Sequence, residues 1–139
     1  MKKTVLLILG IAINLFIWLN SLMPASISSE QSGFIVNIIY PIFKNIIDIN
    51  LFETIIRKLA HFMQFMFLSI VFVNYYRKTK TNKPFIITTI HIMLVAIIDE
   101  TIQLFVPGRA GLITDVLIDV SGGLVGLIIV WLSLKVIKQ

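Results

Sequence analysis

The sequence predicts an all-α membrane protein, a four-transmembrane-helix bundle with an oily amphipathic external segment between helices one and two. Of the 139 residues, 58% are hydrophobic and only 14% are charged, whereas soluble domains have nearer half and a quarter. The apolar residues gather in runs of about 15 to 20, the length needed to cross roughly 30 Å of hydrocarbon. We expect spans at about 5–23, 59–76, 84–105 and 116–134.

The distribution of charge predicts the orientation of these spans. All seven acids lie between spans one and two or between spans three and four: Glu30, Asp48, Glu53, Asp99, Glu100, Asp115 and Asp119. Most basic residues lie in the other polar segments: Lys2, Lys3, Arg77, Lys78, Lys80, Lys83, Lys135 and Lys138. Cytoplasmic loops of membrane proteins are enriched in Lys and Arg. We therefore expect both termini in the cytoplasm and the acids on the external face.

Charge and cysteine content exclude several classes of function. The net charge of +5 does not imply a nucleic-acid partner, because the basic residues flank apolar spans and would meet anionic lipid head groups there. The expected partner is the lipid bilayer, and the oligomeric state is open. Cysteine is absent, which excludes a disulfide framework, a thiolate metal site and a cysteine nucleophile.

The first span and the connection after it allow alternatives. Lys2, Lys3 and the small residues Ala25 and Ser26 are also compatible with a cleavable signal peptide, but the apolar stretch is long for one, and a retained helix is favoured. In the connection, apolar residues recur from Ile35 to Ile47 at helical spacing. This segment, kinked or broken at Pro41, would lie in the outer head-group region or simply cover the bundle.

The ends of the later helices are predicted from capping and turn residues. Asn50 followed by Glu53 indicates an N-cap and a helix that starts near Leu51. Span three should start at Pro84 and continue to Phe105. An external turn follows, marked by Pro107, Gly108 and Gly111, and Thr114 is the expected N-cap of span four.

Three stripes of polar residues descend into these helices near the same membrane face. At 100° per residue each stripe covers about 100° or less, and the members are Glu53, Arg57, His61 and Gln64; Asp99, Glu100 and Gln103; and Asp115, Asp119, Gly122 and Gly126. Ionisable groups at such depths turn inward to pair or to line a wet cavity. The stripes therefore predict a functional site. The alternative is that Arg57, Lys58 and Arg109 simply neutralise the acids.

Individual members of the stripes allow more than one role. His61 could act as a general acid or base or be a hydrogen-bonded helix contact. Glu100 is expected to face the site while its neighbour Asp99 pairs, and Arg109 is either a rim charge or an anion-binding group. Gly122 and Gly126 form a GxxxG packing motif, and His91 is assigned to core packing.

A metal site is not predicted from the sequence. His61 with Glu100, Asp115 and Asp119 could ligate a divalent ion, but no HExxH-type spacing supports it. We therefore predict no metal and no cofactor.

Three segments together resemble the VanZ-like family. Residues 57–62, RKLAHF, resemble its K-x-x-H-F element, and residues 99–109, DETIQLFVPGR, resemble its D-E-x-x-Q-x-F-x-P-x-R element. Asp115, Asp119, Gly122 and Gly126 follow its D-x-x-x-N-x-x-G-x-x-x-G element, with Asp119 where the family usually has Asn. Gln64 and Phe65 stand where Glu and Tyr are common, which weakens any proton relay through that turn.

The resemblance implies one VanZ-like integral membrane domain over residues 1–139, in a bacterial cell membrane. It also implies an association with reduced susceptibility to teicoplanin-type glycopeptide antibiotics. It does not supply a chemical mechanism.

Two functions from different classes fit these residues. In the first, a non-enzymatic protein binds or shields an amphiphile at the outer leaflet, such as a lipid-linked cell-wall precursor or a lipoglycopeptide. The apolar 34–47 segment would meet the tail, and the head would be bound by residues from Arg57, Lys58, Asp99, Gln103, Arg109 and Asp119. In the second, a small intramembrane enzyme modifies a lipid-linked wall intermediate, with His61, Glu100 and Asp115 as catalytic candidates. Ion movement is disfavoured, because the acids gather at one face.

Overall fold

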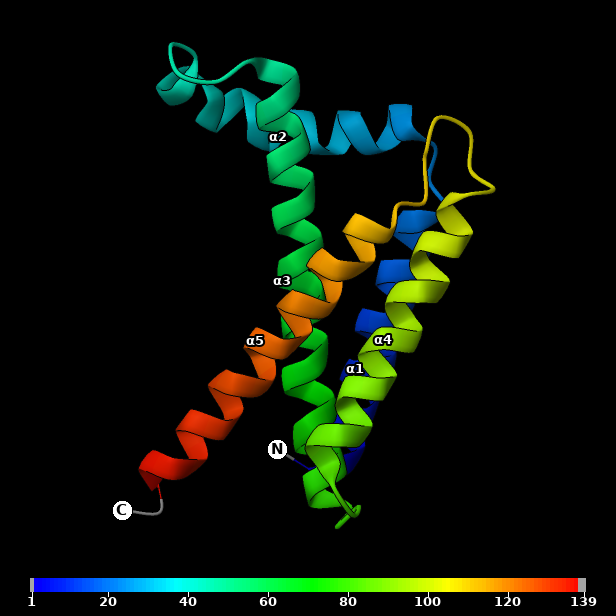
Figure 1. Ribbon diagram of the computed structural model, residues 1–139, viewed down its shortest axis with the longest axis vertical. Helices are drawn as coiled ribbons and strands as arrows, with labels where there is room; N and C mark the ends of the chain where they lie inside the picture. The colour runs from blue at the N-terminus through cyan, green and yellow to red at the C-terminus, as the bar shows by residue number, and fades with distance from the viewer. Residues whose placement is uncertain (1, 138–139) are drawn as a thin grey trace.

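The computed structural model describes residues 2–137, except for the side chain of Gln31. Lys138, counted above among the basic flanks, lies outside this range. The five helices are α1 (Lys3–Ser21), α2 (Ala25–Phe43), α3 (Ile49–Lys78), α4 (Pro84–Gln103) and α5 (Ile113–Ile137), and the described residues form no strand. All except α2 are long and apolar enough to cross a membrane, while α2 lies across one end of the bundle (Figure 1). The predicted four-helix membrane bundle is confirmed.

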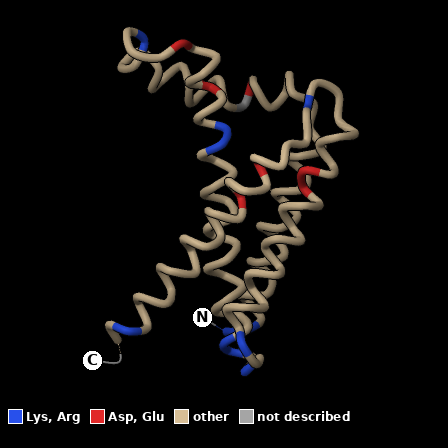
Figure 2. The backbone as a smooth tube through the Cα atoms, viewed as in Figure 1, with Lys and Arg blue, Asp and Glu red and all other residues tan. Residues whose placement is uncertain are grey.

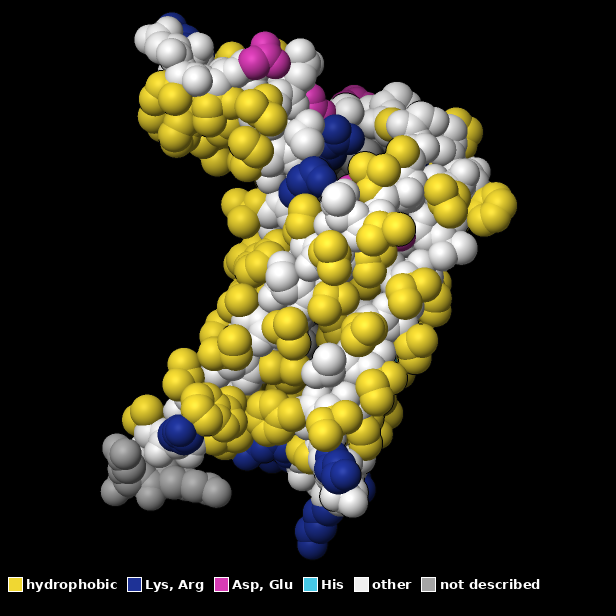
Figure 3. Space-filling view, in the orientation of Figure 1, with side chains coloured by type: hydrophobic (Ala, Val, Ile, Leu, Met, Phe, Trp, Pro, Cys, Tyr) yellow, Lys and Arg dark blue, Asp and Glu magenta, His cyan; other side chains and the backbone are white. Residues whose placement is uncertain are grey.

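The core of the bundle is apolar and narrow. One cluster joins α1, α3 and α4 and contains Ile17, Phe65, Leu68, Phe72, Ile92, Val95 and Ala96. A second cluster joins α3 to α5 through Val73, Leu127 and Val130. Outside these clusters many large apolar side chains are exposed along the helices, as Figure 3 shows. A soluble protein rarely exposes so large an apolar surface, and lipid chains would cover it in a membrane.

Small residues let α5 approach α3 closely. A Cβ atom added at Gly122 would collide with the backbone oxygen of Phe62, and one added at Gly126 would collide with Met66 O and Ser69 Oγ. Only a residue without a side chain fits at such a crossing. The structure therefore confirms that the GxxxG motif serves helix packing.

Two predicted N-caps were wrong. Asp48, not Asn50, caps α3, because its Oδ1 accepts hydrogen bonds from the amides of Asn50 (2.8 Å) and Leu51 (3.4 Å). Asp and Asn are equally good N-caps. Asp48 takes the position because its backbone is still extended immediately before α3 begins at Ile49. Thr114 lies inside α5, since the amides of Asp115 and Val116 already donate to Leu112 O. Helix α4 ends at Gln103, two residues before the predicted end.

The external segment is a longer helix than the pattern predicted. Helix α2 begins at Ala25 and continues through Pro41 to Phe43, so Pro41 does not break it. The proline stands within the last turn, so it removes one i→i−4 hydrogen bond and only two helical residues follow it. The rings of Tyr40 and Phe43 pack on Phe52 of α3, with centroids 5.6 and 5.5 Å away. These contacts join α2 to the start of α3.

Charged residues separate along the long axis of the molecule. Figure 2 shows the Asp and Glu residues in the half near α2, while the opposite end carries Lys and Arg, including the loop between α3 and α4. The acids and most basic residues therefore lie toward opposite ends of the bundle, as the sequence predicted.

We expect Gly122→Ala to destabilise the bundle by about 1–3 kcal/mol, because the new Cβ collides with backbone that cannot move without shifting α3. Helix propensity alone would favour alanine by about 1 kcal/mol, so a loss must come from packing. The measurement is thermal unfolding of the purified protein in detergent.

The matched control is Gly33→Ala on α2, where an added Cβ meets nothing within 4 Å. It should unfold at the wild-type temperature or slightly above it. Equal unfolding temperatures for Gly122→Ala and wild type would contradict the assigned packing role.

Candidate functional site

A cavity of about 250 Å³ lies at the α2 end of the bundle. It is enclosed by the first half of α3, the end of α4, the loop before α5 and the first turns of α5. Its lining residues are Ala25, Thr54, Arg57, Lys58, His61, Glu100, Gln103, Gly108, Arg109, Ala110, Leu112, Asp115, Ile118 and Asp119. The cavity thus brings together every residue proposed from the sequence for binding or catalysis except Asp99.

Helical periodicity explains this convergence. On α3 the lining residues recur at intervals of three and four, from Thr54 through Arg57 and Lys58 to His61, and such positions share one helix face. Glu100 and Gln103 are three apart on α4, and Asp115 and Asp119 are four apart on α5. The three polar stripes therefore face one another at the same depth.

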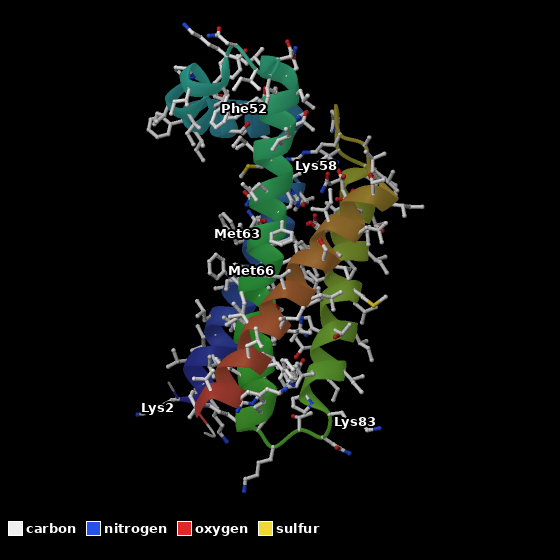
Figure 4. All side chains as sticks on the ribbon, turned by 60° about the vertical axis from the view of Figure 1, so that its left-hand side comes forward. Lys2, Phe52, Lys58, Met63, Met66 and Lys83 are labelled. Carbon is white, nitrogen blue, oxygen red and sulfur yellow. The ribbon has the colours of Figure 1, made fainter. Side chains whose placement is uncertain are left out.

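Lys58 and Asp115 form an ion pair across the cavity, between α3 and α5. Figure 4 shows Lys58 on α3, pointing to the side on which the later helices lie. Both side chains are partly exposed, at 37% and 27%. Neutralisation of acids by bases, the alternative kept open above, holds for this pair.

Arg109 has a different role, since it binds backbone. Its Nε donates to Met23 O and its Nη2 donates to Asn20 O, each at 3.1 Å. Asn20 lies in the last turn of α1, where helix carbonyls lack partners within the helix, and Met23 follows just after its end. Burial lowers the pKa of Arg109, and the nearby charge of Arg57 lowers it further, against the opposing effect of Asp99 and Glu100. Arginine nevertheless keeps its charge in proteins, so Arg109 is a half-buried cation.

Arg57 forms neither a hydrogen bond nor an ion pair with any residue in the described part of the chain. It is half-buried on α3 and lines the cavity. Its guanidinium therefore offers all five N–H donors to a ligand.

Glu100 and Asp99 differ as the sequence predicted. Glu100 lines the cavity, where its Oε1 accepts from Gln103 Nε2 at 3.0 Å and its Oε2 accepts from the Leu112 amide at 2.9 Å. The second bond ties the loop before α5 to α4. Asp99 does not line the cavity and is fully buried. It accepts hydrogen bonds from Ser21 Oγ and, at 3.1 Å, from Gln103 Nε2.

His61 lies between two buried carboxylates. Its Nδ1 is 3.8 Å from Asp99 Oδ2 and 3.6 Å from Asp119 Oδ1. Within the described residues neither His61 Nδ1 nor either carboxylate oxygen of Asp119 has a hydrogen-bond partner. These three side chains are close enough together to hold a metal ion, and His61 also faces the cavity, where it could exchange a proton with a ligand.

Other polar residues of the stripes lie away from the cavity. Glu53 accepts from Ser32 Oγ of α2 at 3.3 Å, and Gln64 does not line the cavity. His91 packs on Phe72, with ring centroids 4.1 Å apart, and its Nδ1 is 3.1 Å from the Tyr76 hydroxyl. The assignment of His91 to core packing agrees with these contacts.

Sequence reasoning missed Ser21, which donates to the buried Asp99. The one available signal was a small polar residue in the last turn of an apolar span. Asn20 gives the same signal in that turn, so the sequence could not single out Ser21.

Comparison with known proteins gives one match. A family model described as VanZ/LLP1 matches residues 5–135, nearly the whole chain. No curated protein and no solved structure matches the chain.

We expect Arg109→Lys to lower the stability of the ligand-free protein by about 1–3 kcal/mol. Lysine keeps the charge but cannot reproduce two directed bonds to the carbonyls of Asn20 and Met23, so the loop before α5 loses both bonds to the end of α1. Thermal unfolding in detergent measures the effect.

Arg77→Lys is the matched control, because among the described residues Arg77 forms a hydrogen bond only with Asn74 Oδ1 on its own helix, at 3.0 Å. It should change stability by less than about 0.5 kcal/mol. If the two variants unfold at the same temperature, Arg109 does not fasten the loop to α1.

Proposed function

The chain belongs to the VanZ/LLP1 family, and we propose that it binds an amphiphile with an anionic head group at the outer leaflet of a bacterial cell membrane. In this proposal the head group enters the cavity at the α2 end of the bundle. The acyl tail stays among the apolar side chains outside it.

The carrying observation is the pair of guanidinium groups in the cavity. Arg57 has no hydrogen-bond or ion-pair partner among the described residues. Arg109 donates to backbone carbonyls through its Nε and Nη2, and its other Nη donates to none of the described residues. Guanidinium groups bind carboxylate and phosphate through two parallel hydrogen bonds. Two cations held together against their mutual repulsion favour an anionic ligand between them.

Helix α2 supports the proposed position of the tail. It begins at the cavity with Ala25 and then carries exposed apolar side chains, including Phe34 (72%), Ile38 (62%) and Ile42 (74%). In Figure 3, apolar side chains gather on the underside of the part of α2 that extends beyond the bundle. An apolar helix face across the end of a bundle suits the boundary between head groups and acyl chains.

Charge supports the proposed orientation. The end opposite α2 carries most Lys and Arg residues, and cytoplasmic ends of membrane proteins are enriched in them. We therefore place both termini in the cytoplasm and the cavity on the external side.

The finer proposal concerns antibiotics. Lipid-linked wall precursors and lipoglycopeptides both carry an acyl tail and a polar head. Shielding the precursor, or capturing the drug, would reduce susceptibility to teicoplanin-type glycopeptides. This step rests on the resemblance to VanZ-like proteins.

An intramembrane enzyme acting on a lipid-linked wall intermediate is the second candidate. The observation in its favour is that His61 and Glu100 line the cavity beside the guanidinium groups, with His61 Nδ1 lacking a hydrogen-bond partner in the described part of the chain. His61 or Glu100 would transfer the proton, and Asp115, held by Lys58, would assist.

We expect Arg57→Gln to abolish protection of expressing cells against a lipid-tailed glycopeptide, because the variant removes the unpaired cation. The minimum inhibitory concentration should fall to that of cells without the protein. Protein levels are matched by blotting, and a tail-less glycopeptide tests the need for the tail.

Two further variants distinguish amphiphile binding from enzymatic acid–base chemistry. Lys44→Gln, at an exposed position in the segment after α2, should keep full protection. Glu100→Gln keeps an acceptor for the Leu112 amide and should also keep protection if the protein only binds. Loss of protection in Glu100→Gln would favour acid–base chemistry. If none of the proteins protects the cells, wild type included, the resistance proposal is refuted.

A further inference from the structure

We propose that His61, Asp99 and Asp119 bind one divalent transition-metal cation, of the Zn²⁺ or Mn²⁺ class, at the base of the cavity. The three residues come from α3, α4 and α5, so the ion would join the three helices where the polar stripes meet. This site differs from the set considered from the sequence, which included Glu100 and Asp115.

The donor atoms already have the separation that a metal needs. His61 Nδ1 lies 3.6 Å from Asp119 Oδ1 and 3.8 Å from Asp99 Oδ2, and all three donor atoms lie within 4.8 Å of one another. Ligands at about 2.0–2.2 Å from a metal are separated by roughly 3–4 Å. Small side-chain rotations would therefore complete the coordination.

The independent observation is that Asp119 is buried without a hydrogen-bond partner among the described residues. Its side chain is 1% exposed, and within the described residues neither oxygen accepts a hydrogen bond. Burying an ionised carboxylate in this state costs several kcal/mol unless a cation compensates it. The nearest nitrogen, His61 Nδ1, likewise lacks a hydrogen bond in the described part of the chain, as a ligand atom that awaits an ion would.

Charge balance favours a dication over a proton in this position. A protonated His61 would bring one positive charge to two carboxylates, which leaves a buried net negative charge. A divalent cation with neutral His61 balances Asp99 and Asp119. In an apolar bundle the balanced arrangement costs less.

Neighbouring groups orient one ligand. Asp99 is fixed by Ser21 Oγ and by Gln103 Nε2, and hydrogen bonds of this kind hold metal ligands in position and tune their affinity. Glu100 and Asp115 have other partners, the Leu112 amide and Lys58. This explains why the ligand set contains Asp99 and not its neighbour.

The donors indicate the class of ion. One imidazole nitrogen and two carboxylates suit Zn²⁺, Mn²⁺ or Fe²⁺, whereas Mg²⁺ and Ca²⁺ prefer oxygen alone. Three protein ligands are typical of zinc sites that keep a position open. That position would face the cavity, because His61 and Asp119 line it. An oxygen of an anionic head group could fill it, and this last step rests on the proposed function.

The experiment measures metal binding by the purified full-length protein in detergent, without lipid ligand. The protein is stripped with a chelator and titrated with Zn²⁺ and with Mn²⁺ by calorimetry, and Co²⁺ absorption reports the coordination. We expect one cation per chain, with at least tenfold weaker binding in His61→Gln and in Asp119→Asn. Asparagine is isosteric with aspartate, and gel filtration and circular dichroism check that each variant folds.

Matched controls are His91→Gln, which removes the other histidine, and Glu30→Gln, which removes an exposed carboxylate. Both should bind the cation as the wild type does. The absence of binding by the wild type, or equal binding by His61→Gln and Asp119→Asn, would overturn the proposal. Because no lipid or drug is present in this experiment, a failure of the amphiphile proposal would leave its result unchanged.

Discussion

The close contact between α3 and α5 is the constraint on which the rest of the structure depends. Gly122 and Gly126 let α5 reach the backbone of α3 at Phe62 and Met66. About one turn nearer the α2 end, the same crossing brings Asp119 to His61, and about two turns nearer it brings Asp115 to Lys58. A side chain at either glycine would separate these groups by widening the crossing. Helix packing and the polar site therefore have one geometric cause.

The polar cluster is expensive in an apolar bundle, and the structure shows how most of that cost is met. Asp99 takes donors from Ser21 and Gln103, Glu100 takes the Leu112 amide, and Arg109 caps the carbonyls that end α1. Among the described residues of this cluster, Arg57 on one side and the Asp119–His61 contact on the other remain without hydrogen bonds. Groups left without partners after such thorough pairing point to ligands.

The sequence predicted the parts of this arrangement that depend on periodicity. Spacing along each helix placed Arg57 with His61, and Asp115 with Asp119, and the glycine motif predicted the crossing. The sequence could not decide between neighbouring residues that are equally suited to the same role. Asp48 and Asn50 have the same capping ability, so the position at which the extended backbone becomes helical decided between them. Ser21 could not be recognised as a donor to Asp99, because that contact joins residues 78 positions apart. The extent of α2 was also missed, since its first turns lack the apolar repeat.

The distribution of charge within the site links the two proposed ligands. The cavity and its base hold three basic side chains, Arg57, Lys58 and Arg109, against four carboxylates, Glu100, Asp99, Asp115 and Asp119. With every acid ionised and His61 neutral, the formal charge is slightly negative, which opposes entry of an anionic head group. A divalent cation at the base would make it positive and would present an open coordination position beside the guanidinium groups. Each ligand would then increase the affinity for the other by the same factor, because coupling between two sites is reciprocal. Under the two proposals, Arg57 and Asp119 would be two ends of one binding site.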